Sequence, residues 1–112
     1  MGHYERMWTF ETERFLVAWD ITPCDYLDLS WDDTGEVREG LESGHYVAFD
    51  SRVAVYLDGQ MIGADYLGQS IYADPADFRD VGGYFGDMVR EAVREAREAL
   101  RSLKDIHVRE AA

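Results

Sequence analysis

The stretch that decides the fold is residues 84–103, which read YFGDMVREAVREAREALRSL. Placed on a helix at about 100° per residue, its apolar side chains gather in one stripe about 120° wide. The members of this stripe are Phe85, Met88, Val89, Ala92, Ala96, Ala99, Leu100, Leu103 and, just beyond the stretch, Ile106. The charged residues from Asp87 to Lys104 fall on the opposite arc. The sequence therefore predicts one long amphipathic helix of roughly 30 Å.

The shape of the stripe indicates what covers it. Its middle is small, with Ala92, Ala96 and Ala99, whereas Phe85 and Leu103 at its ends are large. A flat and bulky surface can approach such a centre closely, and the face of a β-sheet has that shape. Pairing with the same helix of a second copy is the other reading. It would leave a sheet uncovered, so we expect the helix to pack within its own chain.

Two hairpins are predicted ahead of this helix. Residues 8–10 alternate apolar and polar side chains, residues 11–13 form a turn, and residues 15–21 follow with strict period two. Both faces of that second strand are partly apolar, so we expect a well-covered strand. The second hairpin runs from His45, with Asp58-Gly59 as a two-residue turn and a return strand over residues 60–72. Gly63 and Gly68 indicate bulges or a close approach of another backbone.

Two short helices complete the prediction. Thr34 is the expected N-cap of a helix over residues 35–43 that ends at Gly44, and Asp74-Pro75 starts one or two turns through Val81. The chain is thus predicted to be a single α+β domain over residues 1–112. It has an antiparallel sheet of about four strands in two hairpins, with one face covered by the long C-terminal helix, plus one or two short helices. Residues 1–6 and 107–112 are expected to be flexible, and Met7 is an alternative natural start.

The charge of the chain is high and unevenly distributed. The net charge is −12, from 23 acidic and 11 basic residues, and residues 82–112 contribute six of each. The whole excess therefore lies in residues 1–81. Such a surface repels phosphate backbones and anionic membranes, which argues against direct nucleic-acid or membrane binding. A basic protein surface, such as that of a nucleic-acid-binding protein or complex, is the expected partner.

The cellular setting is inferred from cysteine and hydropathy. Cys24 is the only cysteine, so an internal disulfide is excluded. No apolar run approaches the ~20 residues that span a bilayer, and no charged-then-apolar leader begins the sequence. A cytoplasmic protein is expected.

The densest acidic segment is the candidate partner-binding site. Between residues 25 and 44 the only basic residue is Arg38, and Trp31 stands among the acids where no strand period accounts for it. Tryptophan is a common anchor at interfaces, although Trp31 could equally fold back as a lid over the open face of the sheet. The predicted binding residues are Asp25, Asp28, Trp31, Asp32, Asp33, Glu36, Glu39 and Glu42.

No pattern in the sequence indicates catalysis, a cofactor or a metal. An EF-hand alignment starting at Ser30 places Gly35 correctly but puts Leu41 where a bidentate glutamate is needed. The three histidines do not stand at ligand spacing, and neither a phosphate-binding loop nor a nucleophile elbow is present. A pair of catalytic carboxylates needs one member in an apolar pocket, which a solvated acidic run does not provide. We therefore predict a non-enzymatic protein.

Two segments carry a resemblance to a known group. Residues 30–44, SWDDTGEVREGLESG, and residues 63–72, GADYLGQSIY, resemble segments of small acidic proteins from mobile elements and phage-derived regions of proteobacteria. The resemblance extends from Met7 to about Leu103. The group has no known activity and brings no catalytic residues, but it implies a bacterial cytoplasm. Small acidic proteins in that setting often occlude the basic surface of a partner.

Together these features predict an acidic protein-binding module. It would act as a nucleic-acid mimic or as an inhibitor of a host defence complex, of the anti-CRISPR type, with its acids in place of phosphates and Trp31 as an apolar anchor. The alternative is a structural or accessory homodimer that uses its sheet for self-association.

Overall fold

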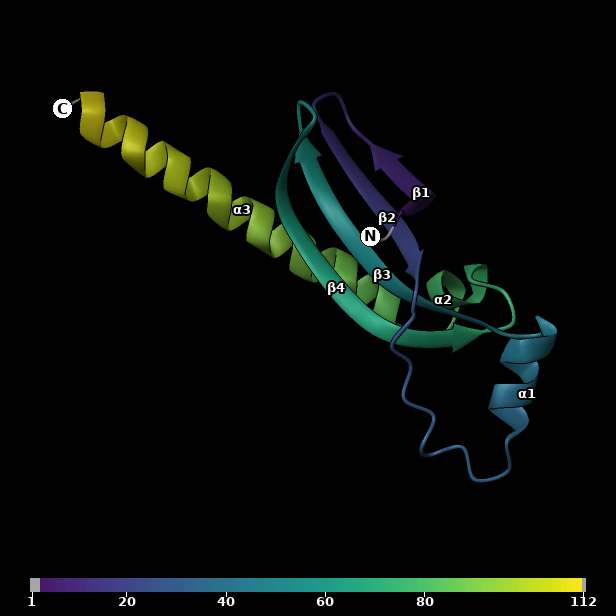
Figure 1. Cartoon of the computed structure of the whole chain (residues 1–112). Helices are drawn as coiled ribbons and strands as arrows, with labels where there is room; N and C mark the ends of the chain where they lie inside the picture. The colour runs from purple at the N-terminus through teal and green to yellow at the C-terminus, as the bar shows by residue number, and fades with distance from the viewer. Residues whose placement is uncertain (1–2, 112) are drawn as a thin grey trace.

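The fold is a four-stranded antiparallel meander with a long helix on one face. The computed structural model describes residues 3–111, and side chains are described for residues 3–103. Neighbouring strands follow chain order, β1-β2-β3-β4 (Figure 1). The strands are β1 (Glu5–Glu11), β2 (Phe15–Pro23), β3 (Val47–Leu57) and β4 (Gln60–Tyr72), and the helices are α1 (Glu36–Ser43), α2 (Ala76–Asp80) and α3 (Tyr84–Ala111). The predicted α+β architecture is confirmed.

The predicted β3–β4 turn has the expected backbone. Asp58 and Gly59 have φ angles of 49° and 84°, the two positive values that a tight hairpin of this kind requires. The turn fixes the register in which Leu57 faces Gln60. Glycine tolerates such angles without strain, and aspartate is among the few other residues that do so readily.

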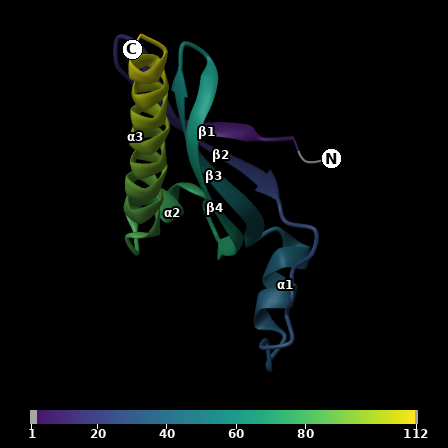
Figure 2. The ribbon, with the colours of Figure 1, turned by 90° about the vertical axis from the view of Figure 1, so that its left-hand side faces the viewer.

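Helix α3 packs directly on the sheet at its small central residues. Ala92 and Ala96 are almost completely buried, and α3 lies mainly over β4 and β3 (Figure 2). A side-chain carbon at Gly63 would lie only 2.6 Å from the backbone nitrogen of Ala96, and closer still to the carbonyl oxygen of Ala92. The expected close approach at Gly63 is therefore confirmed. The core under the helix consists of Trp19, Ile21, Phe49, Val53, Val55, Phe78, Met88, Ala92 and Ala96.

Helix α3 is longer than the surface that covers it. Burial ends at Ala96, and Leu103 is 56% exposed, so the expected coverage of the stripe as far as Leu103 is wrong. The helix continues to Ala111, and neither glycine nor proline follows Gly86 to end it earlier. The expected flexibility of residues 107–112 stays a prediction. Ala112 lies outside the described residues. The result is an elongated molecule of 65 × 27 × 27 Å.

Strand β1 includes the end of the N-terminal segment. It begins at Glu5, which pairs with Ile21, so residues 5 and 6 belong to the sheet. Met1 and Gly2 lie outside the described residues. An ion pair that the strand pattern does not reveal adds to this pairing, because the Arg6 Nε atom donates to the Asp20 carboxylate at 2.9 Å.

Asp20 is a buried charge at the centre of the sheet face that α3 leaves open. Its side chain is 3% exposed and accepts hydrogen bonds from Arg6 on β1 and, at 2.9 Å, from Arg52 on β3. Burial alone would raise the pKa of Asp20, but the two guanidinium groups outweigh it and hold the pKa below its usual value. The Tyr4 ring lies 3.8 Å from the Arg52 guanidinium carbon. Asp20 thus ties three strands together.

Candidate partner interface

The seven predicted binding acids lie on one projecting segment, residues 24–46, which we name the acidic arm. It leaves the end of β2, forms α1 and returns into β3. It extends from the sheet at the end opposite the C-terminus of α3 (Figure 1). The structure therefore brings the predicted residues together on one lobe and does not scatter them over the domain.

The carboxylates of the arm are exposed and uncompensated. Six of the seven are exposed and Asp32 is half-buried. None forms an ion pair within the described residues, although acids of the body such as Asp20, Asp58 and Asp80 do. Seven carboxylates against Arg38 leave the arm with a net charge of −6, half of the −12 carried by the chain. The arm therefore concentrates half of the net charge in 23 of the 112 residues.

The sequence predicts Thr34 as the cap of α1, and the structure shows that Asp32 caps this helix as well. The Asp32 carboxylate accepts hydrogen bonds from the backbone nitrogens of Arg38, at 3.0 Å, and Val37, at 3.4 Å. The Thr34 hydroxyl accepts one from Glu36 at 3.3 Å. Gly35 occupies the cap position itself with φ 77°. Asp32 therefore has a structural role at the positive end of the helix, which its exposed neighbours do not share.

The root of the arm is fastened to β3 and β4 by a cluster centred on Asp50. The Tyr26 hydroxyl donates to the Asp50 carboxylate at 2.9 Å, and so does the backbone nitrogen of Gln69, also at 2.9 Å. The Gln69 side-chain oxygen accepts a hydrogen bond from the backbone nitrogen of Asp28 at 3.3 Å. Gln69 has φ 58°, at a bulge where the β3–β4 register shifts. We call these four residues the latch.

The far side of the arm is held by a close contact between Gly40 and Tyr46. The backbone nitrogen of Tyr46 donates to the Gly40 carbonyl at 3.0 Å, and a side-chain carbon at Gly40 would collide with the Tyr46 ring. Gly40 is the one buried residue of α1. The latch fastens the root of the arm to β3 and β4, whereas the Gly40–Tyr46 contact closes α1 onto the returning segment within the arm. Helix α1 itself lies away from the strands (Figure 2).

Trp31 projects into solvent from the tip of the arm. It is 58% exposed, so it does not form the lid over the sheet that was the other reading. The adjoining turns are closed by backbone hydrogen bonds from Asp32 to Leu29, at 3.0 Å, and from Asp33 to Trp31, at 3.1 Å. A large apolar side chain displayed in this way suits an anchor for a partner.

A cavity of about 680 Å³ lies where the arm joins the sheet. Leu41 and Tyr46 contribute from the arm, and Ile21 and Phe49 contribute from β2 and β3. Cys24 also lines it, and burial raises the pKa of its thiol. This cavity is the hollow nearest to the uncompensated carboxylates. The other lining residues are His3, Tyr4, Glu5, Pro23, Val47, Ala48 and Pro75.

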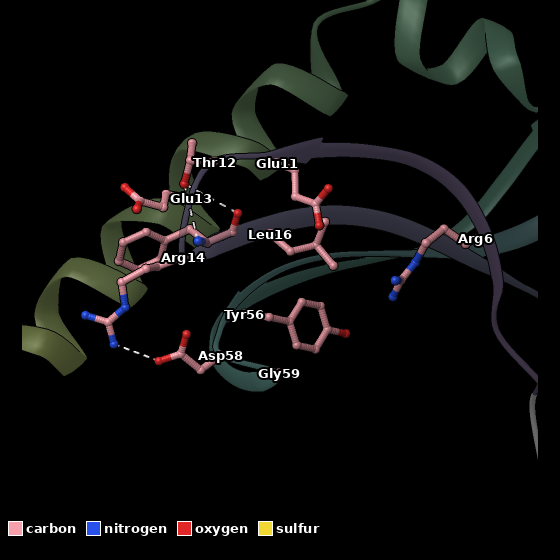
Figure 3. Close-up of a pocket in the computed structure, with 10 residues that line it drawn as sticks. Arg6, Glu11, Thr12, Glu13, Arg14, Leu16, Tyr56, Asp58 and Gly59 are labelled. Atoms are coloured by element: carbon pink, nitrogen blue, oxygen red, sulfur yellow. Dashed lines mark hydrogen bonds and ion pairs between the residues drawn. The ribbon is translucent and has the colours of Figure 1, made fainter.

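A second cavity, of about 440 Å³, lies at the hairpin end of the open face (Figure 3). Its floor is formed by Leu16 and Tyr56, and one side is closed by an ion pair of 2.7 Å between Arg14 and Asp58. Arg6 lines the other side but is already engaged by Asp20. The basic groups of this cavity are thus held by carboxylates of the chain itself.

The groups that acid–base chemistry would use do not converge. Asp65 on β4 is the one described carboxyl whose pKa is raised, first by burial and then by Glu91 and Glu95 on α3. It lies on the helix-covered face, remote from the arm. His45 is exposed, with its ring 4.8 Å from that of Tyr46. Within residues 3–103, no group of three or more histidine, cysteine or acidic side chains is arranged to hold a metal ion.

Comparison of the chain with protein-family models, curated proteins and solved structures found no match. Over the described residues, none of the helices combines the length and the apolar character needed to cross a membrane.

Proposed function

We propose that the chain is a non-enzymatic binding module that presents its acidic arm to a basic protein surface. The observation that carries this proposal is the joint display, on one fastened lobe, of Trp31 and seven carboxylates that have no ion-pair partner among residues 3–103. Uncompensated charge steers association and selects oppositely charged partners. Trp31 and the cavity at the root of the arm provide apolar contact beside it.

The partner class that fits best is a protein that binds nucleic acid. Glu36, Glu39 and Glu42 recur every three residues along α1, which corresponds to about 4.5 Å of axial rise per step. These carboxylates form a series of closely spaced negative charges on an exposed helix, and a basic surface that accepts phosphates attracts such a series through its charge. We place this activity, inhibition of a nucleic-acid-binding complex, in a bacterial cytoplasm, as the resemblance implies.

The fastening of the arm supports binding by a preformed surface. A flexible acidic segment loses conformational entropy when it binds, whereas an arm fastened at the latch and closed by the Gly40–Tyr46 contact has already been ordered by folding. The half-buried cap Asp32 orders α1, so the six exposed acids are the ones left to meet a partner.

The test compares two triple variants with equal changes in charge. In the arm variant, Asp33→Asn, Glu39→Gln and Glu42→Gln remove three exposed carboxylates that form neither a hydrogen bond nor an ion pair within the described residues. In the body variant, Glu11→Gln, Glu13→Gln and Asp77→Asn do the same elsewhere. Tagged chains capture partners from a bacterial lysate at 50 and 500 mM salt, and the affinity of each purified partner is then measured.

At about 0.5 kcal/mol per exposed charge, the arm variant should bind about tenfold more weakly, and the body variant should bind like the wild type. Trp31→Ala should cost about 2 kcal/mol of binding free energy. Duplex DNA should displace the chain from its partner. Equal binding by the arm variant and the wild type would reject the proposal, as would a partner whose contact surface is acidic.

A further inference from the structure

The segment of α3 that extends beyond the sheet has no covering surface within the described chain. Fifteen residues of α3 follow Ala96, which is the last buried position among the side chains described, residues 3–103, and at 1.5 Å per residue they extend about 22 Å. We call residues 97–111 the overhang. An isolated helix of this length is marginal in water, and most helices gain their stability from the packing of an apolar face.

The overhang continues the apolar pattern of the covered half. Val89, Ala92, Ala96, Ala99 and Leu103 follow one another at alternating steps of three and four residues, and Ile106 continues the same spacing in the sequence. This is the repeat of helices that pair along a narrow seam. Leu100 is half-buried and Leu103 is 56% exposed beside it. The pattern is therefore suited to a helical partner at least as much as to a sheet.

We propose that the overhang pairs antiparallel with the overhang of a second copy of this chain. Charge selects a second copy, because residues 82–112 carry six acids and six bases whereas residues 1–81 carry the entire net charge of −12. The net charge of residues 1–81 repels the same residues of a second copy, whereas α3 adds no net charge of its own. Arginines and glutamates alternate along α3, and within one copy Arg94 pairs with Glu91 and Glu98, so these charges are already balanced within the helix.

Charge also selects the antiparallel direction. In a parallel pair the two acidic bodies would lie side by side, whereas an antiparallel pair places them at opposite ends of the joined helices. The opposed helix dipoles favour the same direction. Because each acidic arm lies at the far end of its own molecule from the overhang (Figure 1), a dimer would present two arms with neither obstructed. This inference does not depend on the proposed function.

The first experiment is the mass of the purified chain alone, by light scattering and sedimentation equilibrium from 5 to 200 µM. The seam is narrow, so the dissociation constant is expected to be on the order of 10 µM. The mass should rise with concentration toward twice 12.9 kDa. Leu103→Asp should raise the dissociation constant at least tenfold. Tyr66→Asp, at an equally exposed site on the open sheet face, should leave it unchanged.

The second experiment tests the direction of pairing by disulfide capture in a Cys24→Ser background. Leu103 lies near the middle of the overhang, so an antiparallel pair brings the two copies of this position together. Leu103→Cys should therefore give an oxidised dimer. Ala99→Cys should not, because its two copies would be about 12 Å apart along the axis. A chain that is monomeric at 200 µM overturns the proposal. The proposal is also overturned if Tyr66→Asp abolishes the dimer while Leu103→Asp retains it. Equal cross-linking of the Leu103→Cys and Ala99→Cys variants overturns it as well.

Discussion

The contact of α3 with β4 at Gly63 offers the sharpest test of how the fold is held together. In Gly63→Ala, the added carbon would lie 2.6 Å from the backbone nitrogen of Ala96 and still closer to the carbonyl oxygen of Ala92. Both obstacles are backbone atoms of a helix, so no side chain can rotate away. The helix must move outward by about 1 Å to restore an ordinary contact, and this movement loosens the packing of Met88 and its neighbours on the sheet.

Overpacking of a well-packed core typically costs about 1–3 kcal/mol, and a clash with backbone belongs at the upper end of that range. A loss of about 3 kcal/mol is a large part of the ~5–15 kcal/mol that stabilises an ordinary domain, and it corresponds to roughly 10–20 °C in melting temperature. Circular dichroism at 222 nm during urea and thermal unfolding measures both quantities.

Gly86→Ala is the matched control for this measurement. Its added carbon would lie 3.6 Å from the nearest atom, in the Arg90 guanidinium group, which is an ordinary contact. Because Gly86 lies within α3, alanine there should stabilise the protein by about 0.5–1 kcal/mol. A Gly63→Ala variant as stable as the wild type would refute the direct packing of α3 on β4 at this residue.

Two further predictions concern the buried charge and the latch. Asp20→Asn should cost about 2–3 kcal/mol of unfolding free energy, because it leaves Arg6 and Arg52 facing each other without the carboxylate. The cost stays within this range because Arg6 is half exposed to water. The folded-state pKa of Asp20 is lowered, so its contribution is fully present above the ordinary value of 3.8 and is lost as the pH falls through the folded-state value. Urea unfolding between pH 2 and 7 should show a weaker loss of stability on acidification in Asp20→Asn than in the wild type, and parallel curves would contradict this assignment. Asp50→Ala removes the hydrogen-bond acceptor of both Tyr26 and Gln69. Amide hydrogen exchange should therefore accelerate at least tenfold around residues 25–30, while the β3 core stays protected. Unchanged protection of residues 25–30 would contradict the latch.

The main features of the fold follow from short-range patterns in the sequence. The period of the stripe predicts α3, and Asp58-Gly59 predicts a turn whose positive φ angles the structure contains. The small residues Ala92 and Ala96 predict contact with a flat surface, although only the structure shows that Gly63 is the residue they meet. The extent to which the sheet covers α3 could not be predicted, because periodicity shows which face is apolar and not how far the covering surface extends.

Contacts between residues distant in sequence were missed for a different reason. Nothing around Asp20 indicates that Arg6 and Arg52 lie on either side of it, because strand register brings them together. The latch likewise joins Tyr26, Asp50 and Gln69 across three segments. The acidic arm was predicted as a set of residues because its members are contiguous, but the capping role of Asp32 depends on the local path of the chain.

The elongated outline of the molecule affects how its mass is measured. A compact chain of this length has a radius of gyration of about 13 Å, whereas this one has 17.7 Å. Friction in solution rises with axial ratio, so a single copy would elute from a calibrated gel-filtration column ahead of a spherical protein of 12.9 kDa. Elution volume alone would therefore report too large a particle. Small-angle scattering can separate an elongated monomer from an end-to-end pair through the maximum dimension, because one copy extends 65 Å along its long axis and a joined pair extends much further.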